Sequence, residues 1–264
     1  MTDETIRHQV MWDRLITIVE EQAQTLIRTG FSVSTREAGD VSAGVFDLKG
    51  RMLAQAVTGT PGHINSMALS VKHFIDKFPL STMAEGDIYI TNDPWKGTGH
   101  LHDIVVVTPT FKNKKLVALF ACTTHVVDIG GMGMAPDSKQ IYHEGLFIPL
   151  MYFMKAGQLN ETLLDFVHHN CRESKQVEGD IYALANCNDV GSRRLISMMQ
   201  QYELNDLDEL AKTIINSTKS AMRMAISKLP TKKVFNQMTM DGYDEEIVLN
   251  ASFEVFGDKV IVDF

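Results

Sequence analysis

The sequence is poor in the features that would place it in several common protein classes. It has only three cysteines, which lie far apart and form no Cys-x-x-Cys pair. Such cysteines favour small buried side chains in a reducing compartment over a disulfide framework. No apolar run reaches the roughly 18 residues of a membrane helix, and the first residues include acids in place of an apolar segment. We therefore expect neither a membrane span nor a signal peptide, and a cytoplasmic location.

Positive charge is also scarce. The net charge is −8 over 264 residues, which argues against a nucleic-acid partner because phosphate binding needs a basic surface. A phosphate-binding P-loop, a dinucleotide-binding glycine fingerprint and a Gly-x-Ser-x-Gly elbow are all missing from the sequence. If the chemistry uses ATP, another chain is expected to bind it. The hydrophobic content of 44% is typical of a globular protein with a sizeable core.

Hydrophobic periodicity predicts an α+β fold. Apolar residues spaced three and four apart indicate a helix over residues 4–29, a second over about 65–77, and a mostly helical block over 158–229. Period-two and short apolar runs indicate strands at residues 41–48, 52–57, 87–91, 104–111 and 116–124, with more after residue 232. We therefore predict a mixed sheet around a central hairpin, together with a helical block. Residues 1–264 are interpreted as one unit, with a possible boundary near 228–232.

The clearest local feature is the hairpin. Residues 104–111 and 116–124 flank the polar segment "KNKK", and both runs are apolar on both faces. Such runs are typical of central strands that are covered on each side. The hairpin therefore belongs in the middle of the sheet.

The length of the hairpin turn decides which side chains meet at its open end. With a two-residue turn at Asn113 and Lys114, His102 would lie opposite His125. With a turn one residue longer, Asp103 would lie opposite His125. Both alternatives bring the two strand ends, and the polar residues beside them, into one cluster.

Two His-x-x-Asp pairs lie at that end of the hairpin: His100 with Asp103, and His125 with Asp128. Glycines precede the first pair in "GTGH" and follow the second in "DIGG", which lets the backbone approach a ligand closely. Imidazole nitrogen mixed with carboxylate oxygen suits zinc, manganese or iron(II), whereas calcium and magnesium favour oxygen alone. The alternative is that each pair forms a surface ion pair or a loop hydrogen bond.

An ordered series of motifs runs from about residue 8 to the C-terminus: "REAGDVSAGVFDLKGRMLAQ", "GHINSM", "NDPWKGTGHLHDIVVVTP", "THVVDIGG", "EGLFIP" and "NCR…EGD". Together these motifs resemble the B subunits of ATP-dependent hydantoinases and 5-oxoprolinases. That family includes related subunits of acetone and acetophenone carboxylases and of caprolactamase.

The resemblance implies a division of labour between two subunits. An A subunit with an actin-like ATPase fold would phosphorylate the substrate, and the B subunit, holding a divalent metal, would complete the reaction. A cyclic amide would be opened by water, and a ketone would be carboxylated. Three hypotheses follow: a subunit of an ATP-dependent cyclic amide hydrolase acting on a hydantoin, 5-oxoproline or a lactam; a subunit of a ketone carboxylase; and a non-catalytic assembly module.

The resemblance also assigns roles to individual residues. By motif position, Asp40, His100 and His125 are expected to bind the metal, and Asp103 to be a fourth ligand or to orient one. Asp128 is expected to hold the His125 ring, as carboxylates beside metal-bound histidines usually do. No general base is assigned.

Three further residues are expected around the metal or the substrate. His63 and Asn92 fall in matching motifs. His102 departs from the family pattern, because many relatives have Pro, Asn or Cys there, so it is a poorer metal ligand than its neighbours.

The C-terminus carries a last expectation. The segment "NASFEVFGDKVIVDF" predicts a hairpin whose second strand ends at Phe264, leaving an open apolar edge. Family members are usually longer, and we expect this chain to be the N-terminal part of a B subunit, or a partner to cover the edge.

Overall fold

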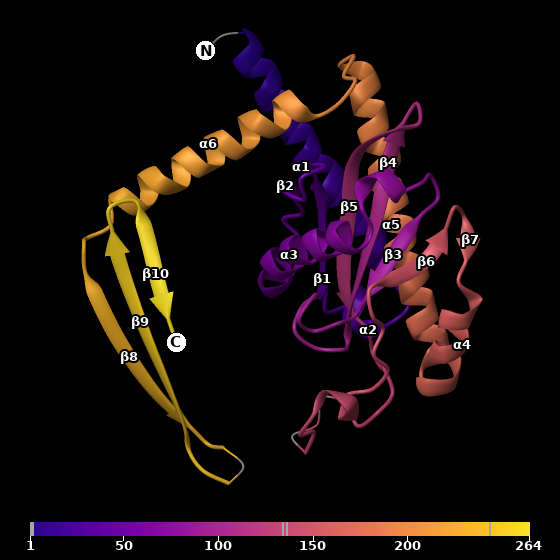
Figure 1. Ribbon diagram of the computed structural model, residues 1–264, viewed down its shortest axis with the longest axis vertical. Coiled ribbons are helices and arrows are strands. Elements are labelled where there is room, and N and C mark those ends of the chain that lie inside the picture. Colours follow the sequence, from indigo (N-terminus) through magenta and orange to yellow (C-terminus); the bar gives the residue numbers. More distant parts are fainter. Residues whose placement is uncertain (1–2, 134, 136, 243) are drawn as a thin grey trace. The chain divides into compact units, whose positions relative to one another are not determined.

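The computed structural model describes residues 3–133, 135, 137–242 and 244–264 (Figure 1). They form two units, Met1–Ala211 and Lys212–Phe264, which are described separately. The predicted boundary at 228–232 falls inside the second unit, between its helix and its strands. No helix among the described residues combines the length and apolar character needed to cross a membrane.

The first unit is built on a seven-stranded sheet with the order β2-β1-β5-β4-β3-β6-β7. Its strands are β1 (Val41–Phe46), β2 (Met52–Gln55), β3 (Ile88–Thr91), β4 (Asp103–Lys112), β5 (Lys115–His125), β6 (Met151–Lys155) and β7 (Gln158–Leu159). Its helices are α1 (Asp3–Thr29), α2 (Val33–Arg36), α3 (Pro61–Lys77), α4 (Glu161–Asn170) and α5 (Ser174–Gln201), with short 3-10 turns at Leu80–Thr82 and Ile141–His143.

The α+β class and the central hairpin are confirmed. Every pairing between the described strands is antiparallel, so the sheet differs from the mixed one that the sequence favoured. Three neighbouring pairs, β1–β2, β4–β5 and β6–β7, are joined by short connections, and such connections produce antiparallel pairs. β6 and β7 were not predicted: no strand was expected at 151–155, and β7 lies at the start of the block that the sequence pattern indicated as helical.

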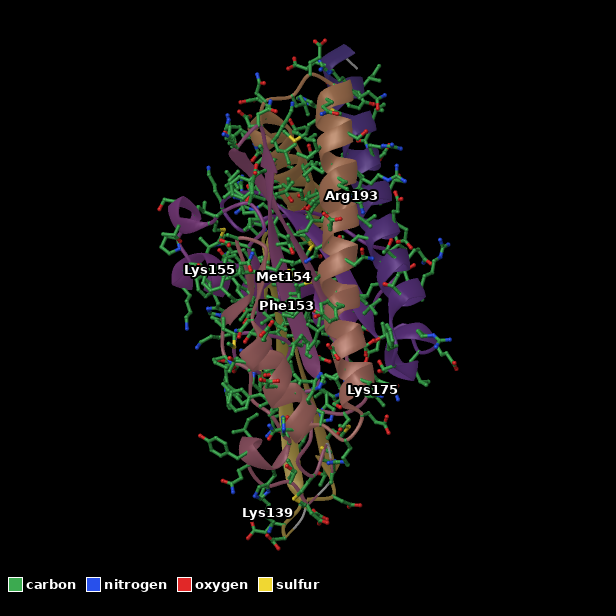
Figure 2. The ribbon with its side chains drawn as sticks, turned by 90° about the vertical axis from the view of Figure 1, so that its right-hand side faces the viewer. Lys139, Phe153, Met154, Lys155, Lys175 and Arg193 are labelled. Atoms are coloured by element: carbon green, nitrogen blue, oxygen red, sulfur yellow. The ribbon has the colours of Figure 1, made fainter. Side chains whose placement is uncertain are left out.

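Helices cover both faces of the central strands. On one face, α1 and α5, which lie side by side (Figure 2), pack with α4 against apolar residues of β1, β4 and β5. Phe153 of β6, which is labelled in Figure 2, reaches the same layer. Its ring meets that of Tyr182 of α5, with ring centroids 5.6 Å apart. On the other face, Met67, Val71 and Phe74 of α3 pack against the same hairpin. This two-sided cover explains why both hairpin strands are apolar on both faces.

The hairpin register combines the two alternatives considered from sequence. The turn has two residues, Asn113 and Lys114, both at positive φ, and Lys112 pairs with Lys115. The register then shifts by one between Phe111 and Thr110, because Val117 is an extra residue on β5. Such a bulge moves all later pairs by one position. As a result, Asp103 lies opposite His125, and His102 does not.

The second unit contains most of helix α6 (Asp208–Ser227) and a three-stranded sheet. Helix α6 begins at the end of the first unit, and the strands are β8 (Lys233–Met240), β9 (Ile247–Phe256) and β10 (Lys259–Asp263), in the order β10-β9-β8. An ion pair of 3.1 Å between Arg223 of α6 and Asp258 ties the helix to the β9–β10 turn. β9 and β10 pair as antiparallel neighbours, which confirms the predicted C-terminal hairpin.

Candidate metal centre

Three adjacent strands present polar side chains in one row. Asp103 begins β4 and His125 ends β5, and the two are direct cross-strand partners. Asp40 directly precedes β1, and its carbonyl accepts the backbone N–H of His125 at 3.1 Å. Because cross-strand partners share one face of a sheet, all three side chains lie on the face covered by α3. Nδ1 of His125 lies 3.1 Å from Oδ1 of Asp103 and 4.0 Å from Oδ2 of Asp40.

His63 closes the row from the helix above it. It lies in the first turn of α3, after Thr60 and Pro61, and is 6% exposed. Its Nε2 is 3.0 Å from Oδ2 of Asp103 and 3.6 Å from Oδ1 of Asp40. The imidazole thus contacts both carboxylates and holds them together.

The loop before β4 brings His100 to the same place. Its Nε2 lies 3.4 Å from Oδ2 of Asp103, and its ring centroid is 5.0 Å from that of His125. Asn92 fixes this loop: its side-chain N–H groups donate to the carbonyls of Leu101 and Leu146, at 2.7 and 2.9 Å, and its oxygen accepts the N–H of Ile148 at 2.6 Å. Asn92 is fully buried, and these three hydrogen bonds hold the loop in place.

His102 stacks on His125. Their ring centroids are 5.2 Å apart with planes 13° apart, and the His102 carbonyl accepts the N–H of Val126 at 2.8 Å. Burial, with the charges of His125 and His100 adding to it, lowers the pKa of His102. A neutral imidazole packed flat against the His125 ring restricts how that ring can rotate.

Asp103 is the centre of the cluster. Its side chain is fully buried and receives a hydrogen bond of 2.7 Å from the Thr98 hydroxyl in addition to the imidazole contacts. Burial acts to raise the pKa of Asp103, but hydrogen bonds from His125 and His63 and the charges of His63 and His100 outweigh it, so the pKa falls well below its ordinary value. Conversely, burial acts to lower the pKa of His63, and the hydrogen bond and charge of Asp103 raise it overall. Asp103 is therefore ionised at neutral pH.

The donor set fits a divalent cation. One ligand atom from each of His100, Asp103 and His125 can be chosen so that all lie within 4.8 Å of one another, which leaves room for an ion between them. Nδ1 of His63, His100 and His102 is buried without a hydrogen-bond partner among the described residues. Unpaired buried nitrogens are costly, and for His100, which belongs to the possible ligand set, coordination of an ion is one way to satisfy the ring. Asp40 borders this set through its 4.0 Å approach to His125.

Asp128 has a different role from the one expected. Its oxygens accept the backbone N–H groups of Gly130 at 3.0 Å, of Glu173 at 3.1 Å and of Arg172. Burial acts to raise the pKa of Asp128, but these backbone hydrogen bonds lower it overall. The carboxylate therefore holds the segment that enters α5, while His125 is oriented by Asp103.

Sequence reasoning missed several groups that surround the cluster. Thr60 donates to Oδ1 of Asp40 at 2.6 Å, Thr98 donates to Asp103, and Ser34 donates to the His125 carbonyl at 2.5 Å. Thr60 could have been found, because Thr-Pro is a frequent helix start and would have placed His63 in a first turn. Nothing local marks Thr98 or Ser34.

Comparisons with known proteins point to one family. The family model described as Hydantoinase B/oxoprolinase matches residues 4–264. The beta chain of the caprolactamase of Pseudomonas jessenii is 28% identical over 267 residues, which cover 99% of this chain and 46% of that protein. A putative D-/L-hydantoinase B chain from a Pseudomonas species is 26% identical over 269 residues, which cover 97% of this chain and 45% of that protein.

Solved structures share the fold. The crystal structure of ATP-dependent caprolactamase from Pseudomonas jessenii superposes with a TM-score of 0.87 at 27% identity, over 99% of this chain and 46% of that chain. Acetone carboxylase in its nucleotide-free form superposes with a TM-score of 0.83 at 16% identity, over 99% of this chain and 37% of that chain, and it shows the fold alone. The chain spans less than half the length of these relatives.

Proposed function

Because this chain belongs to the hydantoinase B/oxoprolinase family, we propose that it is the metal-binding catalytic subunit of an ATP-dependent cyclic amide hydrolase. The substrate would be a hydantoin, 5-oxoproline or a lactam. A hydantoinase A-like ATPase subunit would bind ATP and phosphorylate the substrate in a cytoplasmic complex. The observation that carries the proposal is the convergence of His100, Asp103 and His125 at the open end of one hairpin.

The residues of the cluster would hold a zinc, manganese or iron(II) ion. His100, Asp103 and His125 would be its ligands, with Asp40 as the fourth. Such an ion stabilises developing negative charge on a substrate and lowers the pKa of a bound water.

The surrounding residues prepare the ligands. His63 holds the two carboxylates together, His102 fixes the plane of His125, and the Asn92 contacts fix the loop that carries His100. Pre-organised ligands of this kind lose little conformational entropy when the ion binds. His100 is 27% exposed in its side chain and His125 23%, so the cluster remains open to a small molecule on one side.

Metal analysis tests this proposal. Wild-type protein should bind zinc or manganese at about one ion per chain, measured by competition with a chromogenic chelator. His100→Ala and His125→Ala should both lose that ion while the circular dichroism spectrum is kept. His169→Ala is the matched control, because His169 is exposed and its ring makes a hydrogen bond to the carbonyl of Asp165 in its own helix. Full metal retention in both cluster variants would contradict the proposal and favour an assembly module.

A ketone carboxylase is the second candidate, because acetone carboxylase has the same fold. The relatives at 26–28% identity are named as amide-ring enzymes, which favours the hydrolase. Incubating the complex with ATP and labelled bicarbonate separates the two. Only a carboxylase fixes the label into an acid-stable product.

A further inference from the structure

The sheet of the second unit has two chemically different faces. In an antiparallel pair, residues directly opposite each other point to the same face, and neighbours along a strand point to opposite faces. Met238 lies opposite Leu249, and Thr239 lies opposite Val248. The register of β9 with β10 extends each face across the third strand, where Val262 lies opposite Phe253.

The face that contains Met238 and Leu249 is called the apolar face. With the exception of Asn236, all of its residues are apolar: Val234, Met238, Met240, Ile247, Leu249, Ala251, Phe253, Val255, Val260 and Val262. The opposite face carries four separate apolar residues, Phe235, Val248, Phe256 and Ile261, and is otherwise charged or polar, with Lys233, Gln237, Thr239, Asn250, Ser252, Glu254, Lys259 and Asp263. This alternation is the pattern of a sheet built to be covered on one side.

The apolar face lies open in the second unit. Met238 is 57% exposed, Val262 50% and Leu249 45%. In Figure 1, α6 leads into one end of this sheet and does not lie over the middle of its strands. A small sheet with an uncovered apolar face is marginally stable in water and prone to association.

The open area is large enough for a specific interface. From the fractional exposures, and about 150–200 Å² for a large apolar side chain, the face offers roughly 600 Å² of apolar surface. A stable interface buries about 800 Å² on each partner, including its polar rim. The absence of charge on the face excludes an ionic partner and calls for another apolar layer.

The family comparison indicates what that layer is. The match to the caprolactamase structure covers nearly all of this chain. The matched region of that longer protein therefore includes a counterpart of the β8–β10 sheet, whose apolar face would also need to be covered. More than half of that protein's length has no counterpart in the matched region. We propose that the apolar face of the β8–β10 sheet docks the part of the hydantoinase B/oxoprolinase fold that this chain does not match. The docked part would present an apolar sheet or helix layer of similar extent.

Site-specific photo-crosslinking tests this docking. Benzoylphenylalanine is placed at Leu249 or Met238 on the apolar face, and at Val248 or Thr239 on the opposite face as matched controls. The tagged protein is irradiated in its native host and the crosslinked peptides are identified by mass spectrometry. We expect positions 249 and 238 to join peptides that align with the unmatched part of the caprolactamase beta chain. Positions 248 and 239 should give at least tenfold less of that product.

Each other outcome overturns the proposal. Crosslinks from position 249 to residues 1–211 would show that the first unit covers the face. Crosslinks to a second copy of β8–β10 would assign it to self-association, and crosslinks to an unrelated protein would assign it to a different partner. Equal yields from both faces would show that the apolar face is not an interface. If one variant does not accumulate, its cross-strand partner reports the same face.

Discussion

The two His-x-x-Asp pairs share a sequence pattern and differ in what they do. In the first pair, both side chains join the cluster, because Asp103 is the first residue of β4 and faces His125 directly. In the second pair, only His125 does so. Asp128 lies beyond the end of β5, and its carboxylate accepts backbone N–H groups near the start of α5. The motif alone therefore does not specify the chemistry, because the strand register and the adjoining loop decide whether both of its residues reach the cluster.

The substitution with the largest expected effect disrupts the first pair. Asp103→Asn removes the buried carboxylate that His63, His100 and His125 all approach. Ligand loss should weaken metal binding by more than the roughly 100-fold that loss of an outer partner causes. Competition titration with a chelator measures this change. An affinity within threefold of wild type would show that Asp103 is not a ligand.

A second substitution disturbs the loop that carries the first pair. Asn92→Ala leaves the carbonyls of Leu101 and Leu146 and the N–H of Ile148 without partners in a fully buried position. At about 1–3 kcal/mol for each buried group left unsatisfied, stability should fall by roughly 2–4 kcal/mol after partial relaxation. Urea unfolding measures the loss. A change below the precision of that measurement would contradict a positioning role for Asn92.

The third substitution tests the second pair. Asp128→Asn puts an amide N–H₂ where backbone N–H groups now donate to a carboxylate. We expect a loss of about 1–3 kcal/mol in stability. Metal affinity should stay within threefold of wild type, in contrast to Asp103→Asn. A large loss of metal from this variant would restore the role that the sequence suggested.

The smallest effect concerns the turn that joins the two pairs. Lys114 has a φ of 65°, where a residue with a Cβ is strained. Lys114→Gly should therefore stabilise the protein by up to about 1 kcal/mol, with metal binding unchanged. Lys115→Gly is the control, because that residue pairs in β5 and its replacement should lower the stability. Thermal unfolding distinguishes the two, and a destabilised Lys114→Gly variant would contradict the role given to strain in this turn.

Periodicity predicted much of the fold. The long helix α1, the central hairpin, the helical block and the C-terminal strands were all accessible, because long amphipathic or apolar runs leave few alternatives. Strands β6 and β7 were missed, since their residues follow a stretch rich in Gly, Met and Pro that obscures the pattern. Helix α3 was predicted to begin a turn too late, which left His63 in a loop.

The cluster itself was only partly predictable. Its location followed from the hairpin, since any register brings the strand ends together. Which side chains face each other depended on the bulge at Val117, and an apolar run carries no local signal of a bulge. The contacts of Asp128 depend on where α5 begins in the folded protein, and the sequence near Asp128 does not show this. The identities of the proposed ligands therefore came from the family resemblance, because hairpin geometry alone does not choose among the side chains that it brings together.

The bulge at Val117 has a consequence for how such chains can vary. It adds one residue to one strand of the hairpin. This shifts the pairing by one position, and so decides which residues face each other between the bulge and the cluster. A homologue could lengthen its turn by one residue and lose the bulge, and the same side chains would still meet. The fold has to preserve the number of residues between the polar ends of the two strands. The conformation of the turn that joins them can differ from one homologue to another.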